Sequence, residues 1–377
     1  MQEMLRTLVV GLGRAGAGLH LPVLAKARRR RPDLFAPAAV IGVDRASALP
    51  AGSARDAGSA GSAGSALGGG GAGAARAAEA AADGEHRVVA SLAQARQLLD
   101  PERTVVHVCT PPVARTEVVT ELLELGFRRL LLEKPPAADP GQLARLLELL
   151  RRPGVQSAVV APWLASTLTA RLVDLVEKEA VLGRLRRIEV VQNKPRFQRS
   201  FTTSGHPTAF DVEVPHALGV ALRLAGDAEV VTASCTDLDA VGRREPRLGG
   251  ATVDLVHHGG VRTAVRSDLT SPVRERRITL RFDGGTAVGH YAADASDHHA
   301  QLRLIVGDAA PMEPRTVLRD DALTEFFLRA YEDFAADGPC PSALARQARV
   351  VELIGEAKRL TAGRLSPDAR RELAGAH

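Results

Sequence analysis

Aromatic residues, cysteines and long apolar runs are all scarce in this sequence. Phe, Trp and Tyr make up 3% of the 377 residues, so we do not expect a protein that stacks nucleic-acid bases on aromatic side chains. No apolar run approaches the roughly 18–20 residues that span a bilayer, which argues against a membrane protein. A concentrated basic patch is also missing, since the formal net charge is only +5 and charges of both signs are interspersed. We therefore expect neither nucleic acid nor membrane as a partner.

The cysteines and the N-terminal segment bear on the cellular compartment. Cys109, Cys235 and Cys340 lie far apart, form no CxxC pair and are odd in number, so a disulfide framework is not expected. Residues 1–7 carry charges and lead straight into an apolar run, without the pattern of a secretory signal. A cytoplasmic location is therefore expected.

The overall composition is typical of a globular protein. Hydrophobic residues make up 45% and charged residues 25% of the chain, and the mean hydropathy is -0.03. This apolar content is sufficient to build a core, which excludes disorder over the whole chain. At about 150 residues per domain, the length predicts two domains.

The first part of the chain alternates between apolar runs and helical patterns. The runs lie at 8–10, 38–43, 105–108, 129–132 and 155–160, and a further strand is expected near Val88. Buried strands that alternate with helices predict a parallel sheet covered on both faces, in a domain spanning 1–163. The segment at about 50–84 is mostly Ala, Gly and Ser and is interpreted as a flexible loop inserted into this domain.

The pattern changes after residue 163. A helix at 167–179 is followed by strand patterns at 187–192, 229–235, 252–257, 261–268, 277–282 and 301–306, with one helix at 216–224. Successive strands with few helices between them predict an α+β domain over 164–340, built on a mostly antiparallel open sheet. Helical patterns at 323–334 and 342–360 follow, and 341–377 is predicted to be a C-terminal helical segment.

A GxGxxG motif follows the first apolar run. Gly11 permits a tight turn, Gly13 lets the backbone approach a pyrophosphate, and Gly16 allows the following helix to pack closely. Asp44, at the end of the next strand, is placed to accept hydrogen bonds from a ribose and to repel a 2′-phosphate. NAD is therefore expected and NADP less so, although Arg45 beside this carboxylate softens the preference. The alternative is a glycine turn that only packs a strand against a helix.

Two later strand patterns end in polar residues. One ends in Thr110 and Pro111, the other in Glu133, Lys134 and Pro135, and the carboxyl ends of parallel strands are where such sheets bind ligands. A lysine desolvated beside a nicotinamide can exchange a proton with a substrate, whereas the alternative is a surface ion pair. The predicted cofactor-binding residues are Gly11, Gly13, Arg14, Ala15, Gly16, Asp44, Arg45, Thr110, Pro111, Glu133 and Lys134.

In this order, the glycine motif and the residues at 44–45, 110–111 and 133–135 resemble the Gfo/Idh/MocA family, named for glucose–fructose oxidoreductase and inositol dehydrogenase. The resemblance covers nearly the whole chain. It implies an α/β fold class, with an N-terminal Rossmann dinucleotide-binding domain and a C-terminal α+β domain whose open sheet covers the active site. It also implies oxidation or reduction of a sugar, cyclitol or similar polyol with NAD or NADP, by a homodimer or homotetramer.

The resemblance also implies roles for single residues. Lys134 matches the family lysine that contacts the cofactor and the substrate hydroxyl, and His216 matches the histidine that helps to relay the proton. The family usually has an aspartate four residues before this histidine, where this sequence has Val212. Glu213 is interpreted as the third catalytic residue because it can share a helical face with the histidine, and Asp211 is the less favourably placed alternative.

Other polar residues give weaker signals. Lys194, Arg196 and Asp211 are candidate substrate-binding residues. The two cations suit an acidic or hydroxylated substrate, and a solvated loop is the alternative reading. His20 is expected to pack rather than to catalyse. The adjacent pair at 257–258 would face opposite sides of a strand, so no metal site is expected.

These observations together predict an NAD(H)-dependent oxidoreductase that transfers hydride between nicotinamide and a secondary alcohol or ketone of a sugar-like small molecule. Lys134 would exchange the hydroxyl proton, and His216 would relay it or orient the substrate, with Glu213 as its partner. One alternative is a non-catalytic NAD(P)-binding regulator or sensor of the same fold. Another is a reductase of an imine or an unsaturated bond.

Overall fold

The computed structural model describes residues 4–38, 40–44, 86–179, 182–202, 206–293, 297–307, 315–336 and 341–362. The chain divides into two units. Unit 1 contains Met1–Glu133, Ala144–Val160 and Phe327–Cys340, and unit 2 contains Lys134–Leu143, Ala161–Phe326 and Pro341–His377. The domain boundaries expected near 163 and 340 stay predictions. The Ala/Gly/Ser-rich segment at 50–84, Arg45 and Cys340 lie outside the described residues.

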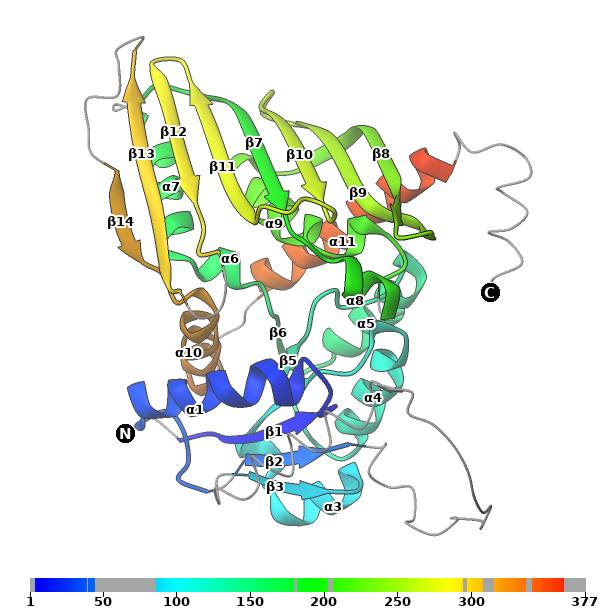
Figure 1. The fold of residues 1–377 in the computed structure, drawn as a ribbon. Coiled ribbons are helices and arrows are strands. Elements are labelled where there is room, and N and C mark those ends of the chain that lie inside the picture. Colours follow the sequence, from blue (N-terminus) through cyan, green and yellow to red (C-terminus); the bar gives the residue numbers. More distant parts are fainter. Residues whose placement is uncertain are drawn as a thin grey trace. The chain divides into compact units, whose positions relative to one another are not determined.

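Unit 1 is built on a parallel sheet of six strands in the order β3-β2-β1-β4-β5-β6 (Figure 1). The strands are β1 (Arg6–Val10), β2 (Val40–Val43), β3 (His86–Val89), β4 (Thr104–Val108), β5 (Arg129–Leu132) and β6 (Gln156–Val159). The predicted parallel sheet is confirmed. Its strand order reverses between β1 and β4, and sheets of this kind bind ligands beside the carboxyl ends of the strands at such a point.

The strands and helices of unit 1 follow from local sequence. Every residue of β2 and β4 is buried, as expected for apolar runs covered on both faces. The helices are α1 (Leu21–Arg30), α3 (Leu92–Leu98), α4 (Pro112–Glu124), α5 (Pro140–Leu150) and α10 (Ala322–Ala335), with the 3-10 turn η3 (Pro101–Arg103). Of these, α5 and α10 each run from one unit into the other. Proline near the start of α1 and α4 costs no hydrogen bond, because the first amides of a helix have no partner within it.

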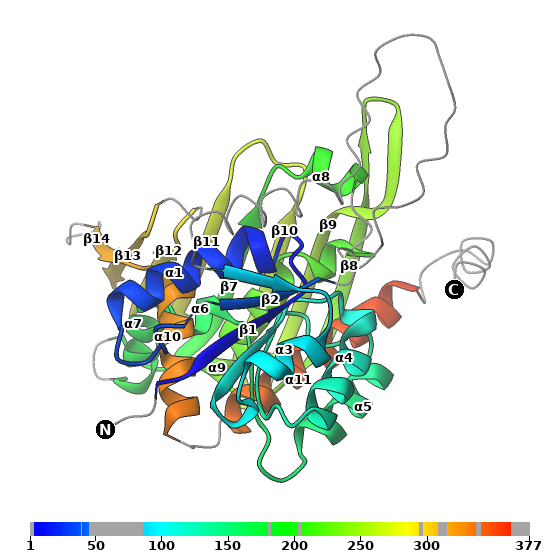
Figure 2. The ribbon, with the colours of Figure 1, turned by 90° about the horizontal axis from the view of Figure 1, so that it is seen from below.

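Unit 2 is built on a sheet of eight strands in the order β14-β13-β12-β11-β7-β10-β9-β8. The strands are β7 (Leu185–Asn193), β8 (Ala228–Ala240), β9 (Arg243–His257), β10 (Arg262–Asp268), β11 (Glu275–Phe282), β12 (Gly285–His290), β13 (His299–Val306) and β14 (Thr316–Arg319). Strands β7 and β10 are parallel and the other neighbours antiparallel, which confirms the mostly antiparallel sheet. The ribbon of β8 and β9 extends beyond the other strands (Figure 2).

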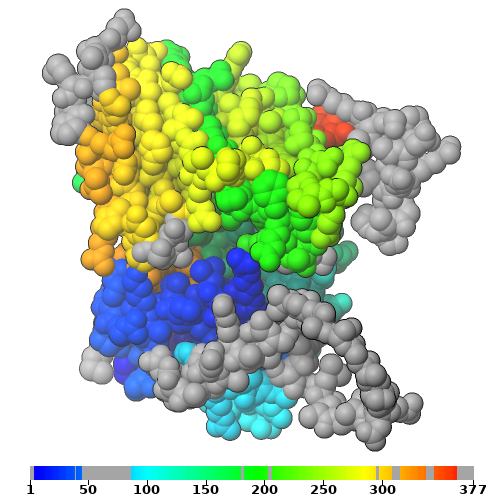
Figure 3. Space-filling view, in the orientation of Figure 1, coloured from blue at the N-terminus to red at the C-terminus, as the bar shows by residue number. Residues whose placement is uncertain are grey.

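Helices cover one face of the second sheet. Helices α7 (Thr167–Glu177), α9 (Val214–Ala225) and α11 (Pro341–Ala362) lie on this face in Figure 1, and the opposite face forms a broad surface of strand side chains in Figure 3. The shorter elements are α6 (Pro162–Ala165), α8 (Phe197–Thr202) and η4 (Ala209–Asp211). Ile188 and Val190 of β7 belong to the core that includes α9. None of the described helices is long and apolar enough to cross a membrane.

Candidate functional site

The glycine-rich turn after β1 requires glycine at two positions. Gly11 has a φ of +91°, and a Cβ added there would lie 3.1 Å from the carbonyl carbon of Cys109. A Cβ added at Gly16 would lie 2.0 Å from the carbonyl oxygen of Gly11, which is far inside van der Waals contact. The turn therefore packs tightly against the end of β4. A helical stretch begins directly behind it, first as the π-helical η1 (Gly16–His20) and then as α1.

Gly13 has free space beside its Cα, whereas Gly11 and Gly16 are closely surrounded by other atoms. A Cβ added there would meet no atom of the described residues within 4 Å. Gly13 and Arg14 are both exposed, and Ala15 is half-buried. A ligand can therefore approach the backbone at this point, where the amides at the start of the helical stretch favour an anion. This shape suits the pyrophosphate of a dinucleotide.

The neighbouring strand ends complete the predicted cofactor site. Asp44 directly follows β2, and the Gly11 amide donates a hydrogen bond to the carbonyl oxygen of Val43 at 2.8 Å, which ties the glycine turn to this strand end. The hydroxyl of Thr110, after β4, is buried and lacks a hydrogen-bond partner among the described residues. A bound amide group can supply that partner, and Pro111 beside it is exposed. The residues of unit 1 thus fit a nicotinamide dinucleotide.

A buried arginine holds two of these strand ends together, and the sequence reasoning missed it. Arg115 of α4 is 1% exposed and donates to the carbonyl oxygens of Glu133, at 2.5 Å, and Thr110. Burial lowers the pKa of its guanidinium to about 10, which leaves the group charged at neutral pH. Its spacing from the buried Val118 and Val119 places it on the apolar face of the helix. A cation at that position was the signal that could have identified it.

Glu133 begins a row of buried polar side chains inside unit 1. Its carboxylate lies 2.8 Å from His20 Nε2, and His20 Nδ1 lies 2.8 Å from His107 Nδ1. The row continues from His107 Nε2 to the Tyr331 hydroxyl at 3.0 Å, and from there to the Thr7 hydroxyl at 2.7 Å. Burial, and then the neighbouring His20, holds the pKa of His107 well below its ordinary value. His20, which the sequence assigned to packing, is fully buried and supports Glu133 from within.

Unit 2 brings together the three residues predicted to be catalytic. Lys134, the first residue of this unit, donates from Nζ to the carbonyl oxygen of Val212 at 3.1 Å. Val212 occupies the position where the Gfo/Idh/MocA family usually has an aspartate, and it contacts Lys134 through its backbone carbonyl oxygen. The His216 amide donates to the carbonyl oxygen of Glu213 at 3.1 Å, and the charges of Lys134 and His216 both act on the Glu213 carboxylate. The three side chains share one electrostatic environment.

Glu213 is a buried carboxylate held by cations. Its Oε1 lies 2.6 Å from Lys194 Nζ, and its Oε2 lies 3.9 Å from Arg276 Nη2. Burial alone would raise the pKa of this carboxyl, but the Lys194 ammonium and three further cationic groups lower the pKa to about 2. Those groups are His216, Arg276 and Lys134. The carboxylate therefore stays ionised across neutral pH and acts as a fixed negative charge.

An aromatic stack fixes the ring of His216. The ring stacks on Trp163 with centroids 5.6 Å apart, and Trp163 in turn stacks on Tyr291 at 4.0 Å. The Tyr291 hydroxyl lies 2.8 Å from the hydroxyl of Thr169, which anchors the stack to α7. The sequence reasoning placed neither Trp163 nor Tyr291 at the site. A single tryptophan in a chain so poor in aromatic residues was the available signal.

Two of the predicted substrate-binding residues make local structural contacts. Asp211 accepts a hydrogen bond from the Thr208 hydroxyl at 2.7 Å and forms a 2.7 Å ion pair with Lys358 Nζ. Arg196 is 3% exposed and donates to the Ser200 hydroxyl at 3.0 Å. Both side chains therefore help to hold the segment that leads from β7 to α9.

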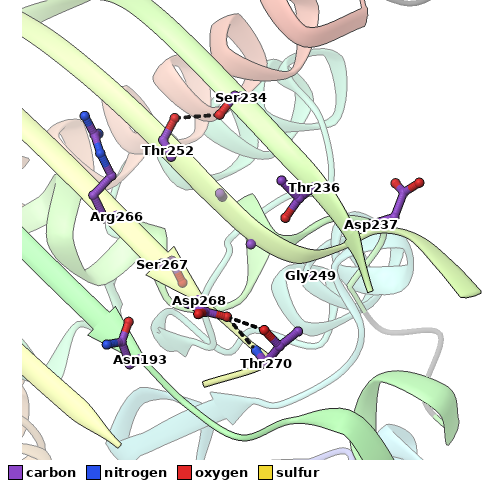
Figure 4. A pocket seen from close by; sticks show the side chains of 12 residues that line it. Asn193, Ser234, Thr236, Asp237, Gly249, Thr252, Arg266, Ser267, Asp268 and Thr270 are labelled. Atoms are coloured by element: carbon purple, nitrogen blue, oxygen red, sulfur yellow. Dashed lines mark hydrogen bonds between the residues drawn. The ribbon is translucent and has the colours of Figure 1, made fainter. Parts of the chain in front are cut away.

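A separate pocket lies on the face of the second sheet opposite to α7, α9 and α11. Its volume is about 330 Å³, and polar side chains of β8, β9 and β10 line it, among them Ser234, Thr252, Arg266 and Asp268 (Figure 4). Most of these groups bind one another or their neighbours. The hydroxyls of Ser234 and Thr252 lie 2.8 Å apart, and Asp268 accepts two hydrogen bonds from Thr270. The pocket contains none of the predicted site residues. Among its lining groups, the Ser267 hydroxyl is buried and has no hydrogen-bond partner among the described residues.

The described residues offer no cluster of three or more His, Cys, Asp and Glu side chains that could hold a metal ion. His257 uses its two ring nitrogens within the protein, at 2.8 Å from the carbonyl oxygen of Gly226 and 2.8 Å from the Thr263 hydroxyl. Burial lowers the pKa of this histidine, so its ring is neutral at neutral pH. Its contacts account for it as a structural residue.

Comparisons with known proteins agree with the geometry of unit 1. Residues 5–161 match the Gfo/Idh/MocA model, described as an oxidoreductase family with an NAD-binding Rossmann fold. No curated protein matches the sequence. The match covers the glycine turn, the strand ends around it and Lys134.

Solved structures resemble the chain over nearly its whole length. One is KijD10, a 3-ketoreductase from Actinomadura kijaniata in complex with NADP and TDP-benzene, with a TM-score of 0.72 and 15% identity over 95% of this chain and 98% of that one. Another is the UDP-N-acetylglucosamine 3-dehydrogenase GnnA from Acidithiobacillus ferrooxidans, with a TM-score of 0.66 and 17% identity over 95% and 98% of the two chains. At these identities the likeness shows a shared fold.

Proposed function

Because this chain is an oxidoreductase of the Gfo/Idh/MocA family, which it matches over residues 5–161, we propose that it transfers hydride between a nicotinamide cofactor and a secondary alcohol or ketone of a sugar, cyclitol or related polyol. The observation that carries this proposal is the cluster of Lys134, Glu213 and His216. Lys134 comes two residues after the end of β5 and directly follows Glu133. The glycine turn, Asp44 and Thr110 would hold the cofactor. GnnA, described as a UDP-N-acetylglucosamine 3-dehydrogenase, supports a sugar substrate, and KijD10, described as a 3-ketoreductase, supports ketone chemistry.

The chain's own residues supply the proton transfer. When bound, the nicotinamide supplies or accepts the hydride. Lys134 Nζ binds the reacting oxygen and gives it a proton as a ketone is reduced, or removes that proton as an alcohol is oxidised. His216, held flat by the aromatic stack, binds the same oxygen or passes the proton onward. Glu213 keeps its negative charge throughout and stabilises the protonated forms of both groups.

The choice of cofactor follows from the residue at the end of β2. Asp44 favours the two free ribose hydroxyls of NAD over the 2′-phosphate of NADP, so NAD is the proposed cofactor. KijD10 is described as an NADP complex, and NADP therefore stays the alternative. The cytoplasmic location and the homodimer or homotetramer expected from the sequence stay predictions.

Replacing Lys134 tests the proposed chemistry. We expect Lys134→Met to lower kcat by about 100-fold or more on any sugar or cyclitol that the wild-type protein turns over, because the proton donor to the reacting oxygen is lost. Lys178→Met, at an exposed position, is the matched control and should leave kcat unchanged. Fluorescence titration with NAD and NADP should show cofactor binding in all three proteins, with the tighter affinity for NAD.

Two results would contradict the proposal. Unchanged kcat in a folded Lys134→Met variant would remove the role of the lysine. Cofactor binding with no turnover of any polyol or keto sugar by the wild-type protein would indicate the regulator or sensor instead. A panel that includes cyclic imines and enones tests the remaining alternative, a reductase of an unsaturated bond.

A further inference from the structure

We propose that the substrate carries a negatively charged group, a carboxylate or a phosphate, and that Lys194 and Arg276 bind this group beside Gln192. The inference rests on the proposed function and names the substrate class. It rests on three observations within unit 2, namely the balance of charge, the register of the sheet, and the unsatisfied polar atoms of a buried side chain.

Several cationic side chains gather around Glu213. Electrostatic interactions among the described residues link these cations with one another and with two carboxylates. The cations are Lys134, Lys194, Arg196, Arg199, Arg276 and Lys358, and the carboxylates are Asp211 and Glu213. Burial, and then the nearby Lys134 and Arg196, lowers the pKa of His206 to about 4. The part of this shift that comes from Lys134 and Arg196 reflects a positive potential at His206, and such a potential favours an anion.

The register of the second sheet brings polar side chains to one end of an otherwise apolar face. Ile188 and Val190 of β7 are buried in the core, and the next residue of the same alternation is Gln192. Arg276 on β11 lies directly opposite Gln192, and Ser267 on β10 lies opposite it on the other side. The core face of the sheet therefore ends in an amide, a guanidinium and a hydroxyl on three adjacent strands.

Gln192 is buried with its hydrogen-bonding capacity unused. The residue is 1% exposed, and neither Oε1 nor Nε2 has a hydrogen-bond partner among the described residues. The hydroxyl of Ser267 lacks one as well. Unsatisfied buried amides cost free energy and are rare in folded proteins, so this layer of the sheet is suited to a ligand that supplies acceptors and donors.

The two cations beside Gln192 are reachable and incompletely neutralised. The side chains of Lys194 and Arg276 are 20% and 23% exposed, whereas the Glu213 carboxylate between them is 7% exposed. The Glu213 carboxylate contacts both cations, Lys194 at 2.6 Å and Arg276 at 3.9 Å. Because the contact with Arg276 is long, this carboxylate neutralises the guanidinium only in part. A second anion can bind at Arg276 and be shared with Lys194 in charge-assisted hydrogen bonds.

A neutral polyol would gain little from this arrangement. Hydroxyl groups can bind cations, but they leave the positive charge uncompensated as water is excluded. A carboxylate on the sugar and a phosphate attached to it offer the same chemistry, namely two or more negatively charged oxygens for a guanidinium and an ammonium. The test therefore includes both sources.

The decisive experiment compares ligands that differ in charge. It also compares variants at two neighbouring arginines of β11, whose side chains lie on opposite faces of the sheet. Affinity is measured by titration calorimetry at fixed ionic strength, in the presence of cofactor, for glucose, glucuronate, glucose 1-phosphate and UDP-glucose. We expect at least one anionic ligand to bind about tenfold or more tighter than glucose. Arg276→Gln and Lys194→Met should each reduce that preference about tenfold. Arg277→Gln is the matched control, because Arg277 follows Arg276 on β11 and pairs with Glu275. It should bind like the wild type.

The outcomes separate this inference from the proposed function. The inference is overturned if no anionic ligand binds more tightly than glucose, or if Arg277→Gln weakens anion binding as much as Arg276→Gln does. Turnover of a neutral polyol without any preference for its acidic counterpart would leave the oxidoreductase proposal intact and remove this one. Cofactor titration in each variant, together with far-UV circular dichroism, shows that the protein is folded. Gln192→Leu adds a check, since it should lower anion affinity while the fold and cofactor binding persist.

Discussion

At the scale of single residues, His206 and Glu213 have depressed pKa values, but burial acts on them in opposite directions. Burial disfavours the charged form of both groups. The surrounding cations also disfavour a positive charge on the histidine, but they stabilise the negative charge of the carboxylate. The sequence offered Glu213 and Asp211 as alternatives for the third catalytic position. It could not rank them by contact, because Lys194, Arg276 and Lys358 come from distant elements. In the structure Asp211 pairs with Lys358, and Glu213 pairs with Lys194 and Arg276.

His206 predicts how stability depends on pH. The unfolded chain takes up the proton near the ordinary pKa of 6.5 and the folded protein only near 4, so acid favours unfolding in this window. The stability due to the neutral ring is complete above pH 6.5 and is lost as the pH falls to about 4. Urea unfolding of the wild type should show a loss about 1–2 kcal/mol larger between pH 7 and pH 5 than His206→Gln shows. His299→Gln, at an exposed position, is the control and should keep the wild-type dependence. Identical pH profiles for wild type and His206→Gln would contradict this account.

At the scale of elements, strands were predictable where a single face or both faces bury apolar side chains. The strands β1, β4 and β5 are rich in apolar residues and almost wholly buried, so sequence alone indicated both the strands and the parallel sheet. Strand β12 was not predicted because glycine interrupts its alternation at Gly285 and Gly289, and β14 is only four residues long. Their pairing with β13 is a long-range property of the sheet, which local patterns do not contain.

Substitutions at two glycines of the turn should affect different properties, namely the stability of the fold and the affinity for the cofactor. Gly16→Ala places a methyl group 2.0 Å from the Gly11 carbonyl oxygen, so we expect a loss of about 2 kcal/mol or more in the free energy of unfolding. Gly13→Ala meets open space and should change that free energy by less than about 0.5 kcal/mol, while it weakens NAD binding about tenfold or more. Urea unfolding and fluorescence titration measure the two quantities. Normal NAD affinity in Gly13→Ala would show that the dinucleotide does not approach the backbone there.

At the scale of the whole chain, residues far apart in the sequence meet in the interior of unit 1. Phe327–Cys340 belongs to this unit although the sequence pattern places it after the second sheet, and Tyr331 contributes the buried hydroxyl between Thr7 and His107. The sequence predicted the helix that carries Tyr331 but not its partner, because a contact across 324 positions leaves no local periodicity. The fold class could be read from the order of strands and helices, and the motif residues from their strand ends. Arg115, Arg276 and Tyr331 could not be assigned, since their roles depend on tertiary neighbours.

This long-range contact predicts an energetic coupling between Thr7 and Tyr331. Tyr331→Phe removes hydrogen bonds to Thr7 and His107 and should lower the free energy of unfolding by about 1–3 kcal/mol, because buried polar atoms lose their partner. A double-mutant cycle with Thr7→Val should give a coupling energy of about 0.5 kcal/mol or more. Purely additive effects would mean that the two hydroxyls do not interact in solution.

The row from Thr7 to Glu133 has one further consequence, which concerns its polarity. With the carboxylate ionised and both imidazoles neutral, each hydrogen in the row points towards Glu133, from Thr7 through Tyr331, His107 and His20 in turn. A single extra proton on His20 makes both of its nitrogens donors. His107 must then accept at Nδ1 and donate at Nε2, and the tyrosine hydroxyl must turn towards the threonine. Gain of one positive charge beside Glu133 thus reverses the three hydrogen bonds from His20 to Thr7, whereas His20 Nε2 continues to donate to Glu133.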